Sequence, residues 1–264
     1  MTMKSSFRKK TLAIIIAAFV LMAAGLTFLS GDRYVVPVLM YHSIDTDDKL
    51  TKLSVSPKSF SRQMEFFSRN KYNVVSLSQV AEYIEKKLKV PAKTVAITFD
   101  DGFENNYKYA FPVLKKYNIP ATIFIIVERV GSPGYLSWGE IKEMADSGLI
   151  SIGSHTMSHG FLTSLDENGL RHELGDSKKA LEAVIGPGVK YLCYPMGRHS
   201  ELVKKIAKES GYECAVTTSS SMDTVSDSDR YAIKRVRISR TSDNLFTFWL
   251  KTSGYYLWAK RLTR

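Results

Sequence analysis

The stretch TVAITFDDG (94–102) joins six β-forming residues to two adjacent carboxylates and a glycine. Short apolar runs of this kind are typical of buried strands. Comparable runs recur along the chain: VPVLMY (36–41), NVVS (73–76), ATIFII (121–126), ISIGS (150–154), KYLCY (190–194), ECAVTT (213–218) and RVRIS (235–239). Helical stretches separate most of them, which predicts an α/β fold, a parallel sheet with helices outside it. About eight strands over roughly 230 residues favour a distorted, closed (β/α) barrel with seven or eight parallel strands over an open sheet.

Capping signals predict where several helices begin and end. Three helix starts are indicated by Ser56 with Pro57, by Ser137 with Glu140, and by Ser164 with Glu167. The first pair has a capping side chain before a proline, and the other two have the spacing of capping boxes. Gly211 indicates the end of a helix over 200–210.

The amino end has the layout of an export signal. Lys4, Arg8, Lys9 and Lys10 precede 19 uncharged residues (11–29). As a helix, this run would span about 28 Å, close to the thickness of the hydrocarbon core of a bilayer. We therefore predict a signal-anchor segment over 1–33, forming one transmembrane or signal helix, and a single folded domain over 34–264. The basic residues favour a domain outside the cell, held at the cell membrane by the helix or secreted if the segment is cleaved.

The charge divides between these two parts. The chain of 264 residues has a formal net charge of +11, and residues 1–30 hold four of the basic residues and no acid. The remaining net charge of +7 suits a protein that acts beside anionic lipids or wall polymers. Nucleic acid is not an expected partner, because the sequence has no basic motif with interleaved stacking aromatics. The oligomeric state is not indicated.

The two cysteines leave two alternatives open. Cys193 and Cys214 would form a disulfide in an oxidising compartment if their geometry allowed it. Alternatively, they are two small buried residues on neighbouring strands. Two cysteines without histidines at finger-like spacing argue against a thiolate zinc site.

Chemically useful residues follow the predicted strands directly. In a parallel α/β sheet, the carboxyl ends of the strands carry the functional site. These positions hold Tyr41-His42, Asp100-Asp101-Gly102, His155 with His159, and the segment 194–197. By contrast, His172 within a helix and His199 on a loop are expected to face solvent.

Two histidines and a carboxylate at these ends predict a metal site. Asp100 and Asp101 would repel one another unless a cation or a donor lay between them. His155 and His159 are four residues apart, a spacing suited to a single metal ion. Two His with one carboxylate form a hydrolytic zinc set that leaves positions open for water and substrate.

Together these motifs resemble the polysaccharide deacetylases with a NodB homology domain, carbohydrate esterase family four, over about residues 36–240. TFDDG (98–102) resembles the first family motif, and SHTMSH (154–159) the second. The resemblance implies that Asp100 is the base and that Asp101, His155 and His159 bind Zn²⁺ or another divalent metal. CYPMG (193–197) resembles the third motif and implies that the backbone N–H of Tyr194 binds the oxyanion.

The sequence departs from the common family pattern in two places. Cys193 stands where the third motif usually opens with an Arg that orients the base, and no Leu-x-His motif follows near the carboxyl end. PVLMYHSI (37–44) resembles a branch with rearranged strand order that includes deacetylases of poly-N-acetylglucosamine, which implies His42 as the acid. Arg235 resembles the late-strand Arg of that branch and would hold Asp100 ionised through a charge-assisted hydrogen bond. Arg237 alternates with it along the same strand.

The resemblance implies metal-assisted removal of N-acetyl groups from an exported or cell-wall polysaccharide, with release of acetate. Two alternatives are O-deacetylation of xylan or wall polymers and a tethered carbohydrate-binding protein without catalysis.

The tail 243–264 combines six aromatic residues with four basic ones. It is predicted to form a last helix on the barrel, or else an element that contacts membrane or glycan.

Overall fold

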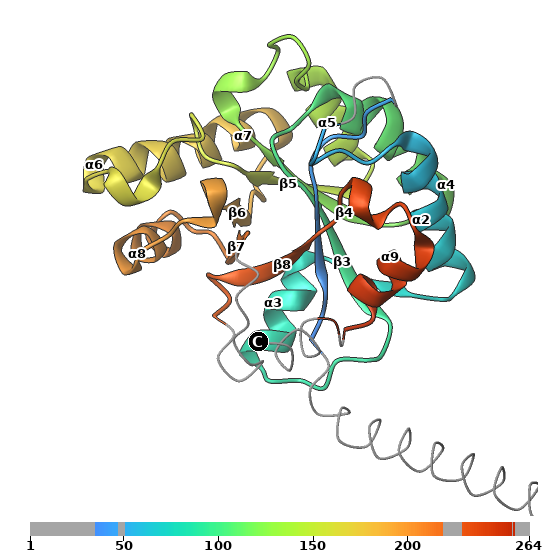
Figure 1. Cartoon of the computed structure of the whole chain (residues 1–264). Coiled ribbons are helices and arrows are strands. Elements are labelled where there is room, and N and C mark those ends of the chain that lie inside the picture. Colours follow the sequence, from blue (N-terminus) through green and yellow to red (C-terminus); the bar gives the residue numbers. More distant parts are fainter. Residues whose placement is uncertain (1–34, 47–50, 219–228, 255, 257–264) are drawn as a thin grey trace, which may run out of the picture. The chain divides into compact units, whose positions relative to one another are not determined.

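The computed structural model describes residues 35–46, 51–218, 229–254 and 256. Eight strands form one sheet in the order β1-β8-β7-β6-β5-β4-β3-β2, and β1 also pairs with β3. All of these pairings are parallel. Seven strands therefore close into a barrel and β2 is an extra strand beside β3 (Figure 1). The strands are β1 (Val38–Tyr41), β2 (Asn73–Val74), β3 (Thr94–Phe99), β4 (Ala121–Ile125), β5 (Ile150–Ser154), β6 (Tyr191–Cys193), β7 (Cys214–Thr217) and β8 (Ile233–Arg237).

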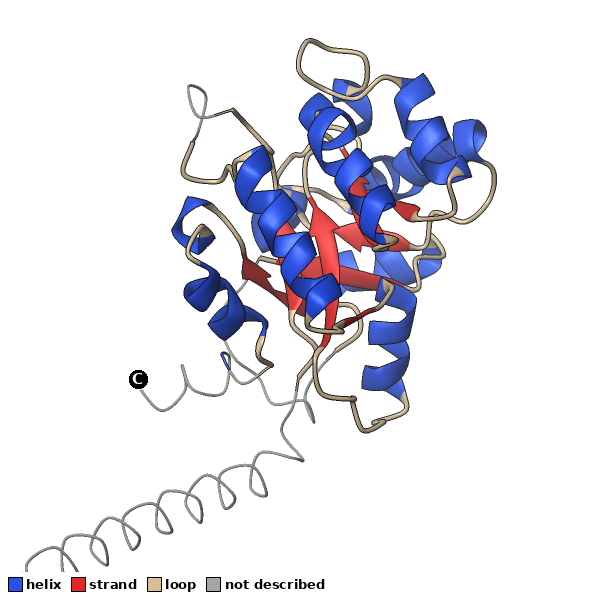
Figure 2. Cartoon of the chain, turned by 90° about the vertical axis from the view of Figure 1, so that its right-hand side faces the viewer, coloured by secondary structure: helices blue, strands red, loops and turns tan. Residues whose placement is uncertain are grey.

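The helices of the described residues lie around these strands, as Figure 2 shows. They are α2 (Pro57–Arg69), α3 (Leu77–Glu85), α4 (Phe111–Tyr117), α5 (Trp138–Asp146), α6 (Glu167–Leu170), α7 (Ser177–Ile185), α8 (Glu201–Glu209) and α9 (Leu245–Thr252). Two π-helical segments, η2 (Asn106–Ala110) and η5 (Arg171–Asp176), continue directly into α4 and α7. The predicted closed barrel of alternating strands and helices is thus confirmed.

The capping predictions are confirmed at most helices and wrong at one. Ser56 caps α2 and the Ser137/Glu140 capping box opens α5. Gly211 follows α8 with φ +81°, as expected for a helix end. The pair Ser164/Glu167 is not a capping box, because Ser164 ends a 3₁₀ turn. The cap of α6 is Asp166, which accepts a hydrogen bond from the Gly169 amide.

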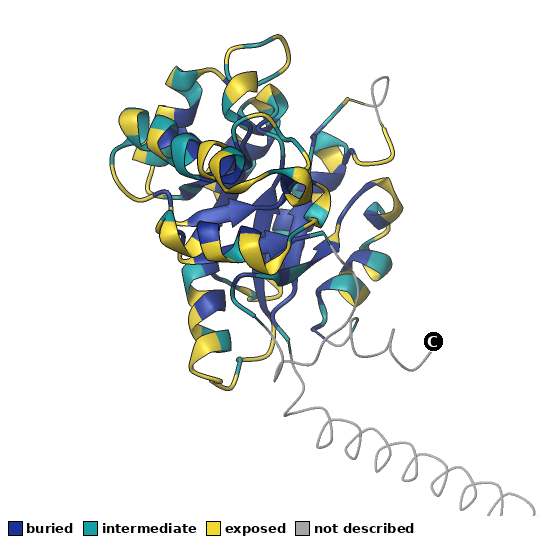
Figure 3. Cartoon of the chain, turned by 90° about the vertical axis from the view of Figure 1, so that its left-hand side faces the viewer, coloured by how far each residue is buried: buried dark blue, intermediate teal, exposed yellow. Residues whose placement is uncertain are grey.

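The strands carry the core. Every residue of β1, β3, β4, β6 and β7 is buried, and Figure 3 shows the exposed residues gathered on the outer helices and loops. Cys193 and Cys214 are both buried and free, on the neighbouring strands β6 and β7. The β6–β7 register pairs Cys193 with Val216 rather than with Cys214. Of the two alternatives, the unpaired buried cysteines are confirmed.

The predicted anchor segment lies outside the described residues. Within the part of the chain that the structure describes, none of the helices has the length and apolar character needed to cross a bilayer.

The predicted last helix is present as α9, which buries Phe248 at ring distances of 5.9 and 5.1 Å from Phe66 and Phe67. Packing on the barrel is therefore confirmed for α9, and residues 257–264 lie outside the described part.

Candidate metal centre

Strand register brings the predicted site residues together at one end of the barrel. The β1–β3 pairing sets Tyr41 opposite Phe99, so the residues that follow, His42 and Asp100, are neighbours. The β5–β6 pairing sets Ser154 opposite Leu192, and this places His155 beside Cys193. Because parallel strands end at the same edge, residues far apart in sequence meet here.

The predicted metal ligands converge. Asp101 Oδ1 lies 3.5 Å from His155 Nε2 and 3.8 Å from His159 Nε2, and the three ligand atoms lie within 4.8 Å of one another. The side chain of His155 is 3% exposed, against 18% for Asp101 and 31% for His159. The triad is thus anchored on the barrel side and open toward solvent on the other. Two imidazoles and a carboxylate arranged this way fit a divalent cation with free positions.

Hydrogen bonding prepares His155 as a ligand. Its Nδ1 lies 2.8 Å from the carbonyl oxygen of Cys193, which can only accept, so Nδ1 carries the proton. Nε2 is therefore the ring nitrogen that faces Asp101 and His159, and it can bind either a proton or a metal ion. Burial alone would lower the pKa of His155, but Cys193 and Asp101 raise it well above its ordinary value. The surroundings of His155 therefore favour a positive charge, which a metal ion also supplies.

A buried carboxylate supports the loop that carries both histidines. Glu173, on η5, is 6% exposed and accepts hydrogen bonds from the amides of Met157 and Ser158, each at 3.0 Å. It also accepts one from the Ser158 hydroxyl at 2.5 Å. In this loop Thr156 and His159 have φ values of +68° and +66°, a region that costs energy for residues other than glycine. The contacts of Glu173 hold the loop in this conformation.

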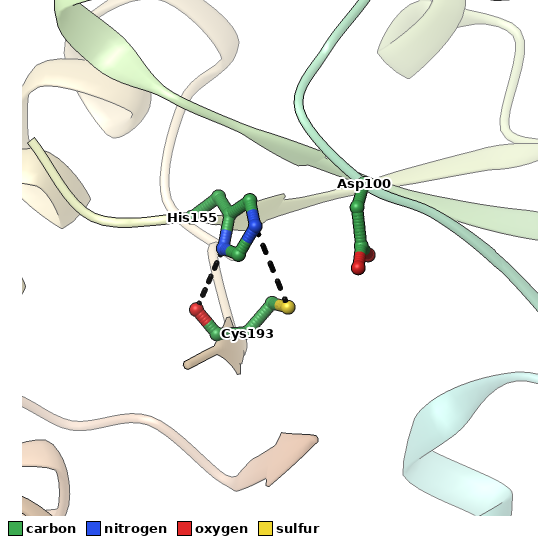
Figure 4. A group of neighbouring side chains, drawn as sticks. All are labelled: Asp100, His155 and Cys193. Carbon is green, nitrogen blue, oxygen red and sulfur yellow. Dashed lines mark hydrogen bonds between the residues drawn. The ribbon is translucent and has the colours of Figure 1, made fainter. Parts of the chain in front are cut away.

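A second group of ligand-type side chains, Asp100, His155 and Cys193, lies deeper in the barrel (Figure 4). The guanidinium of Arg235 contacts two members of this group, Asp100 and Cys193. It donates to both oxygens of Asp100 at 2.6 and 2.7 Å and to Cys193 Sγ at 3.1 Å. A metal ion there would lie against a fixed positive charge. The geometry therefore favours the group formed by Asp101, His155 and His159 as the metal site.

Arg235 has a hydrogen-bond acceptor for each of its five N–H groups. Besides Asp100 and Cys193, it donates to Thr98 Oγ1 at 3.0 Å and to the Thr217 carbonyl at 3.2 Å. Burial acts to raise the pKa of Asp100, but the charge and hydrogen bonds of Arg235 outweigh it and lower this pKa to about 2. The predicted contact between Arg235 and Asp100 is thus present. Arg237, two residues further on, is exposed at the end of β8.

His42 lies on the other side of Asp100, with Nε2 3.9 Å from Asp100 Oδ2. Its Nδ1 is buried and has no hydrogen-bond partner among the described residues. Burial lowers the pKa of His42, although Asp100 and Asp101 act in the opposite direction. His42 thus places an imidazole with an unsatisfied nitrogen beside the two carboxylates.

The oxyanion role predicted for the Tyr194 amide is not supported by the structure. This N–H donates to the Val216 carbonyl at 3.1 Å, so it belongs to the sheet. Pro195 has no N–H, and the amides of Gly197 and Arg198 donate to the carbonyls of Tyr194 and Pro195. By elimination, Met196 has the one amide of this loop without an acceptor among the described residues. Met196 has φ +53° and is 45% exposed.

His199 is only partly exposed, whereas the sequence predicted that it would face solvent. Its ring stacks on Tyr194 at a centroid distance of 5.0 Å, and Nδ1 lies 3.1 Å from the Gly197 carbonyl. His172 is exposed on η5, as expected. Both histidines lie outside the group of metal ligands.

Comparisons with known proteins match the chain to polysaccharide deacetylases. The family profile described as polysaccharide deacetylase matches residues 87–215. YxkH of Bacillus subtilis (strain 168), which is named as a polysaccharide deacetylase, is 38% identical over 204 residues, covering 77% of this chain and 71% of that protein. A poly-beta-1,6-N-acetyl-D-glucosamine N-deacetylase of Staphylococcus aureus (strain MSSA476) is 30% identical over 216 residues, covering 77% and 73%. The solved structure of the Streptococcus pyogenes deacetylase PplD in complex with acetate has a TM-score of 0.75 and 28% identity, covering 84% of this chain and 99% of that one.

Proposed function

Because this chain belongs to the polysaccharide deacetylase family, whose members are hydrolases acting on carbon–nitrogen bonds other than peptide bonds, we propose that it removes N-acetyl groups from an N-acetylglucosamine polymer in a metal-dependent reaction. The products would be acetate and a free amine on the sugar. One observation carries the proposal: Asp101, His155 and His159 converge beside the buried Asp100–Arg235 pair. A relative named for the β-1,6-linked polymer supports the choice of substrate.

Asp101, His155 and His159 would hold the metal, Zn²⁺ or another divalent ion. When bound, such an ion polarises the acetyl carbonyl and lowers the pKa of water toward about 7, so that a weak base can take the proton. The hydrogen bond from His155 Nδ1 to the Cys193 carbonyl fixes the ring in the orientation that this requires.

Asp100 would accept the proton of the attacking water. Its pKa of about 2 keeps the carboxylate ionised at every physiological pH, and Arg235 fixes both of its oxygens. Arg235 acts through Asp100 and is a positioning residue.

His42 would protonate the departing nitrogen. An amine anion is a very poor leaving group, so cleavage of an amide needs an acid at this point. The His42 imidazole lies next to Asp100 and has a free nitrogen, and it would be protonated when it acts. The Met196 amide replaces that of Tyr194 as the proposed donor to the oxyanion.

The location is a separate proposal, supported by the sequence of residues 1–33 alone. A basic start followed by 19 uncharged residues favours a protein held at the cell membrane with its barrel outside, or secreted after cleavage. In either form, the proposed partner is an N-acetylated polysaccharide.

Two measurements test the proposed reaction. Chelation should abolish acetate release from N-acetylglucosamine oligomers, and added Zn²⁺ should restore it; activity that is indifferent to chelators contradicts the metal role. Acetate release should then be compared among β-1,6 poly-N-acetylglucosamine, chitin-type, peptidoglycan and xylan oligomers. Release from O-acetylated xylan alone would replace the amidase proposal by an esterase.

A further inference from the structure

A group of lysines lies at the end of the barrel opposite the proposed metal site. The segment KKLKVPAK (86–93), between α3 and β3, holds four lysines and no acid, and a further lysine shortly precedes β2. Because the strands are parallel, residues that precede them lie at the amino end of the barrel, whereas the metal ligands follow strands and lie at the other end. Figure 1 shows the chain between α3 and β3 along the lower edge of the described fold. We refer to these five exposed residues as the lysine rim: Lys71, Lys86, Lys87, Lys89 and Lys93.

Hydrogen bonds join the two parts of the lysine rim into one surface. The Asn73 amide donates to the Lys93 carbonyl at 2.9 Å. The ammonium of Lys93 donates to the Asn70 carbonyl at 3.1 Å, next to Lys71. The turn before β2 and the segment before β3 therefore lie side by side.

Nearby acids leave most of this positive charge unpaired. Lys86 pairs with Glu82 at 2.7 Å, and Glu85 pairs with Arg230 at 2.8 Å. Among the described residues, the other four lysines of the rim have no acidic partner. Leu88, in the middle of the segment, is 44% exposed. The lysine rim thus combines unpaired cations with an exposed apolar side chain.

Three of these lysines have backbone conformations that favour glycine or asparagine. Lys71, Lys87 and Lys93 have φ values of +55°, +49° and +60°. Two of them stand in the turns that end α2 and α3, and in the equivalent turns after α8 and α4 the chain has Gly211 and Asn118. A positive φ costs energy for a lysine and persists where function requires the side chain. The conformation of these turns therefore does not explain why lysine occupies them.

The amino end of the barrel is also where the chain continues into residues 1–34. The Ala96 amide donates to the Pro37 carbonyl at 3.1 Å, so the start of β1 lies beside the start of β3. If residues 1–33 hold the protein at a membrane, as proposed above, a lipid surface is the nearest anionic partner of this end. Lysines beside a membrane segment attract anionic headgroups, and an exposed apolar side chain can enter the headgroup layer.

We propose that the lysine rim and Leu88 form a docking surface for the headgroups of anionic lipids. This inference rests on the proposed location of the protein and goes beyond it, because it gives the barrel an orientation. The metal site then faces away from the bilayer, toward polysaccharide outside it.

The test uses the full-length protein in vesicles of phosphatidylcholine, alone or mixed with phosphatidylglycerol. An environment-sensitive dye is attached at Leu88→Cys, since Cys193 and Cys214 are both 0% exposed. Its emission should shift to the blue only with phosphatidylglycerol, and about 0.5 M NaCl should reverse the shift by screening the charges. The control is the same dye at Leu202→Cys, which should not respond, because Leu202 is 39% exposed at the start of α8 and lies at the other end of the barrel.

A charge-removing variant in the labelled background tests the lysines themselves. Lys71→Asn/Lys87→Asn/Lys93→Asn removes three charges and places at each position a residue that tolerates a positive φ, so the fold is kept. This variant should lose the blue shift and release acetate from soluble oligomers at the wild-type rate. The matched control, which should keep the shift, removes three exposed lysines from α2, α7 and α8: Lys58→Gln/Lys179→Gln/Lys205→Gln.

Separate outcomes overturn the docking surface and the proposed location. Emission that is the same with and without phosphatidylglycerol, or a shift that persists in the asparagine variant, overturns the docking surface even if the protein floats with the vesicles. Failure to float with phosphatidylcholine vesicles overturns the membrane segment. Sedimentation with phosphatidylglycerol vesicles then tests the surface, and equal binding of the wild type and the asparagine variant overturns it. A shift with soluble polyphosphate but not with phosphatidylglycerol overturns the assignment to lipid.

Discussion

Arg235 and Asp100 form a two-pronged ion pair with Nη–Oδ distances of 2.6 and 2.7 Å, although they are 135 residues apart in the sequence. Their side chains are 0% and 2% exposed, so neither charge is in contact with bulk water. Such a pair stabilises the fold only while both partners are present, because a single buried charge is costly.

Removing the arginine should therefore destabilise the protein more than removing both charges. Arg235→Met is expected to lower the free energy of unfolding by about 3–5 kcal/mol, the range for breaking a buried pair. The double variant Asp100→Asn/Arg235→Met should lose less than Arg235→Met alone, and clearly less than the sum of the single variants, as measured by denaturant unfolding. Arg237→Met, at the exposed end of the same strand, is the control and should change stability by no more than about 0.5 kcal/mol. Additive losses would show that the two charges are not coupled.

Cys193 should be dispensable for metal binding. Since the Arg235 guanidinium lies 3.1 Å from its sulfur, the group around this thiol is unsuited to a cation. Cys193→Ala should keep one metal per chain by elemental analysis, like the control Cys214→Ala on the next strand. Asp101→Asn and His159→Ala should each lose the metal. Loss of metal in Cys193→Ala would shift the site toward Asp100 and Cys193.

His42→Gln should separate amide from ester hydrolysis. Without its acid, the protein should lose about 10²- to 10⁴-fold in kcat on N-acetyl substrates. Activity on an aryl acetate should fall much less, because a phenolate departs without protonation. Metal content should remain at one per chain, and the exposed His172→Gln should match wild type in both assays. Equal losses on the amide and the ester would remove His42 as the acid.

Glu173 should make the stability of the metal-free protein depend on pH in the acidic range. Burial raises the pKa of this carboxyl, but hydrogen bonds from Ser158 and Met157 outweigh burial and lower it below the ordinary value. A carboxyl whose pKa is lower in the folded state than in the unfolded state stabilises the protein. This contribution is fully present at pH values above the unfolded-state pKa of about 4.3, and it is lost as the pH falls through the folded-state pKa. The difference in unfolding free energy between wild type and Glu173→Gln should be constant near neutrality and shrink in acid. A difference that grows in acid would reverse the assigned sign, and the exposed Asp146→Asn serves as control.

The fold and most of the site could be predicted from the sequence because both depend on local patterns. Apolar runs identified every strand, and the residues directly after these runs include the proposed metal ligands and His42. The role of β2 could not be predicted, since its two residues resemble any other short strand. Only the strand pairing shows that, among the described strands, β2 pairs with β3 alone. Similarly, Ser164 has the right spacing for a cap, but Asp166 lies nearer to the helix and takes that role.

The remaining differences arise from hydrogen bonding across the sheet. The Tyr194 amide is unsuited to bind an oxyanion because it donates its hydrogen bond to the Val216 carbonyl on another strand. Arg235 and Arg237 lie two residues apart, so the alternation of a strand places both on the same face and does not distinguish them. In the structure Arg235 is buried and Arg237 is exposed. Glu173 gave no signal in the sequence, because its contacts with the histidine loop form only when η5 lies beside that loop.

The pairing of β1 with both β3 and β8 has a consequence for how the protein is made. His42 follows the first strand of the ring and Arg235 lies on the last, so a growing chain has the three metal ligands long before it has the partner of Asp100. Contacts between such distant segments form slowly, because a long loop must be ordered first. A chain that stops before residue 233 would have the ligands but neither Arg235 nor a closed ring. Enzymatic activity should therefore appear only after synthesis has passed the last strand, and it can serve as an assay of complete folding.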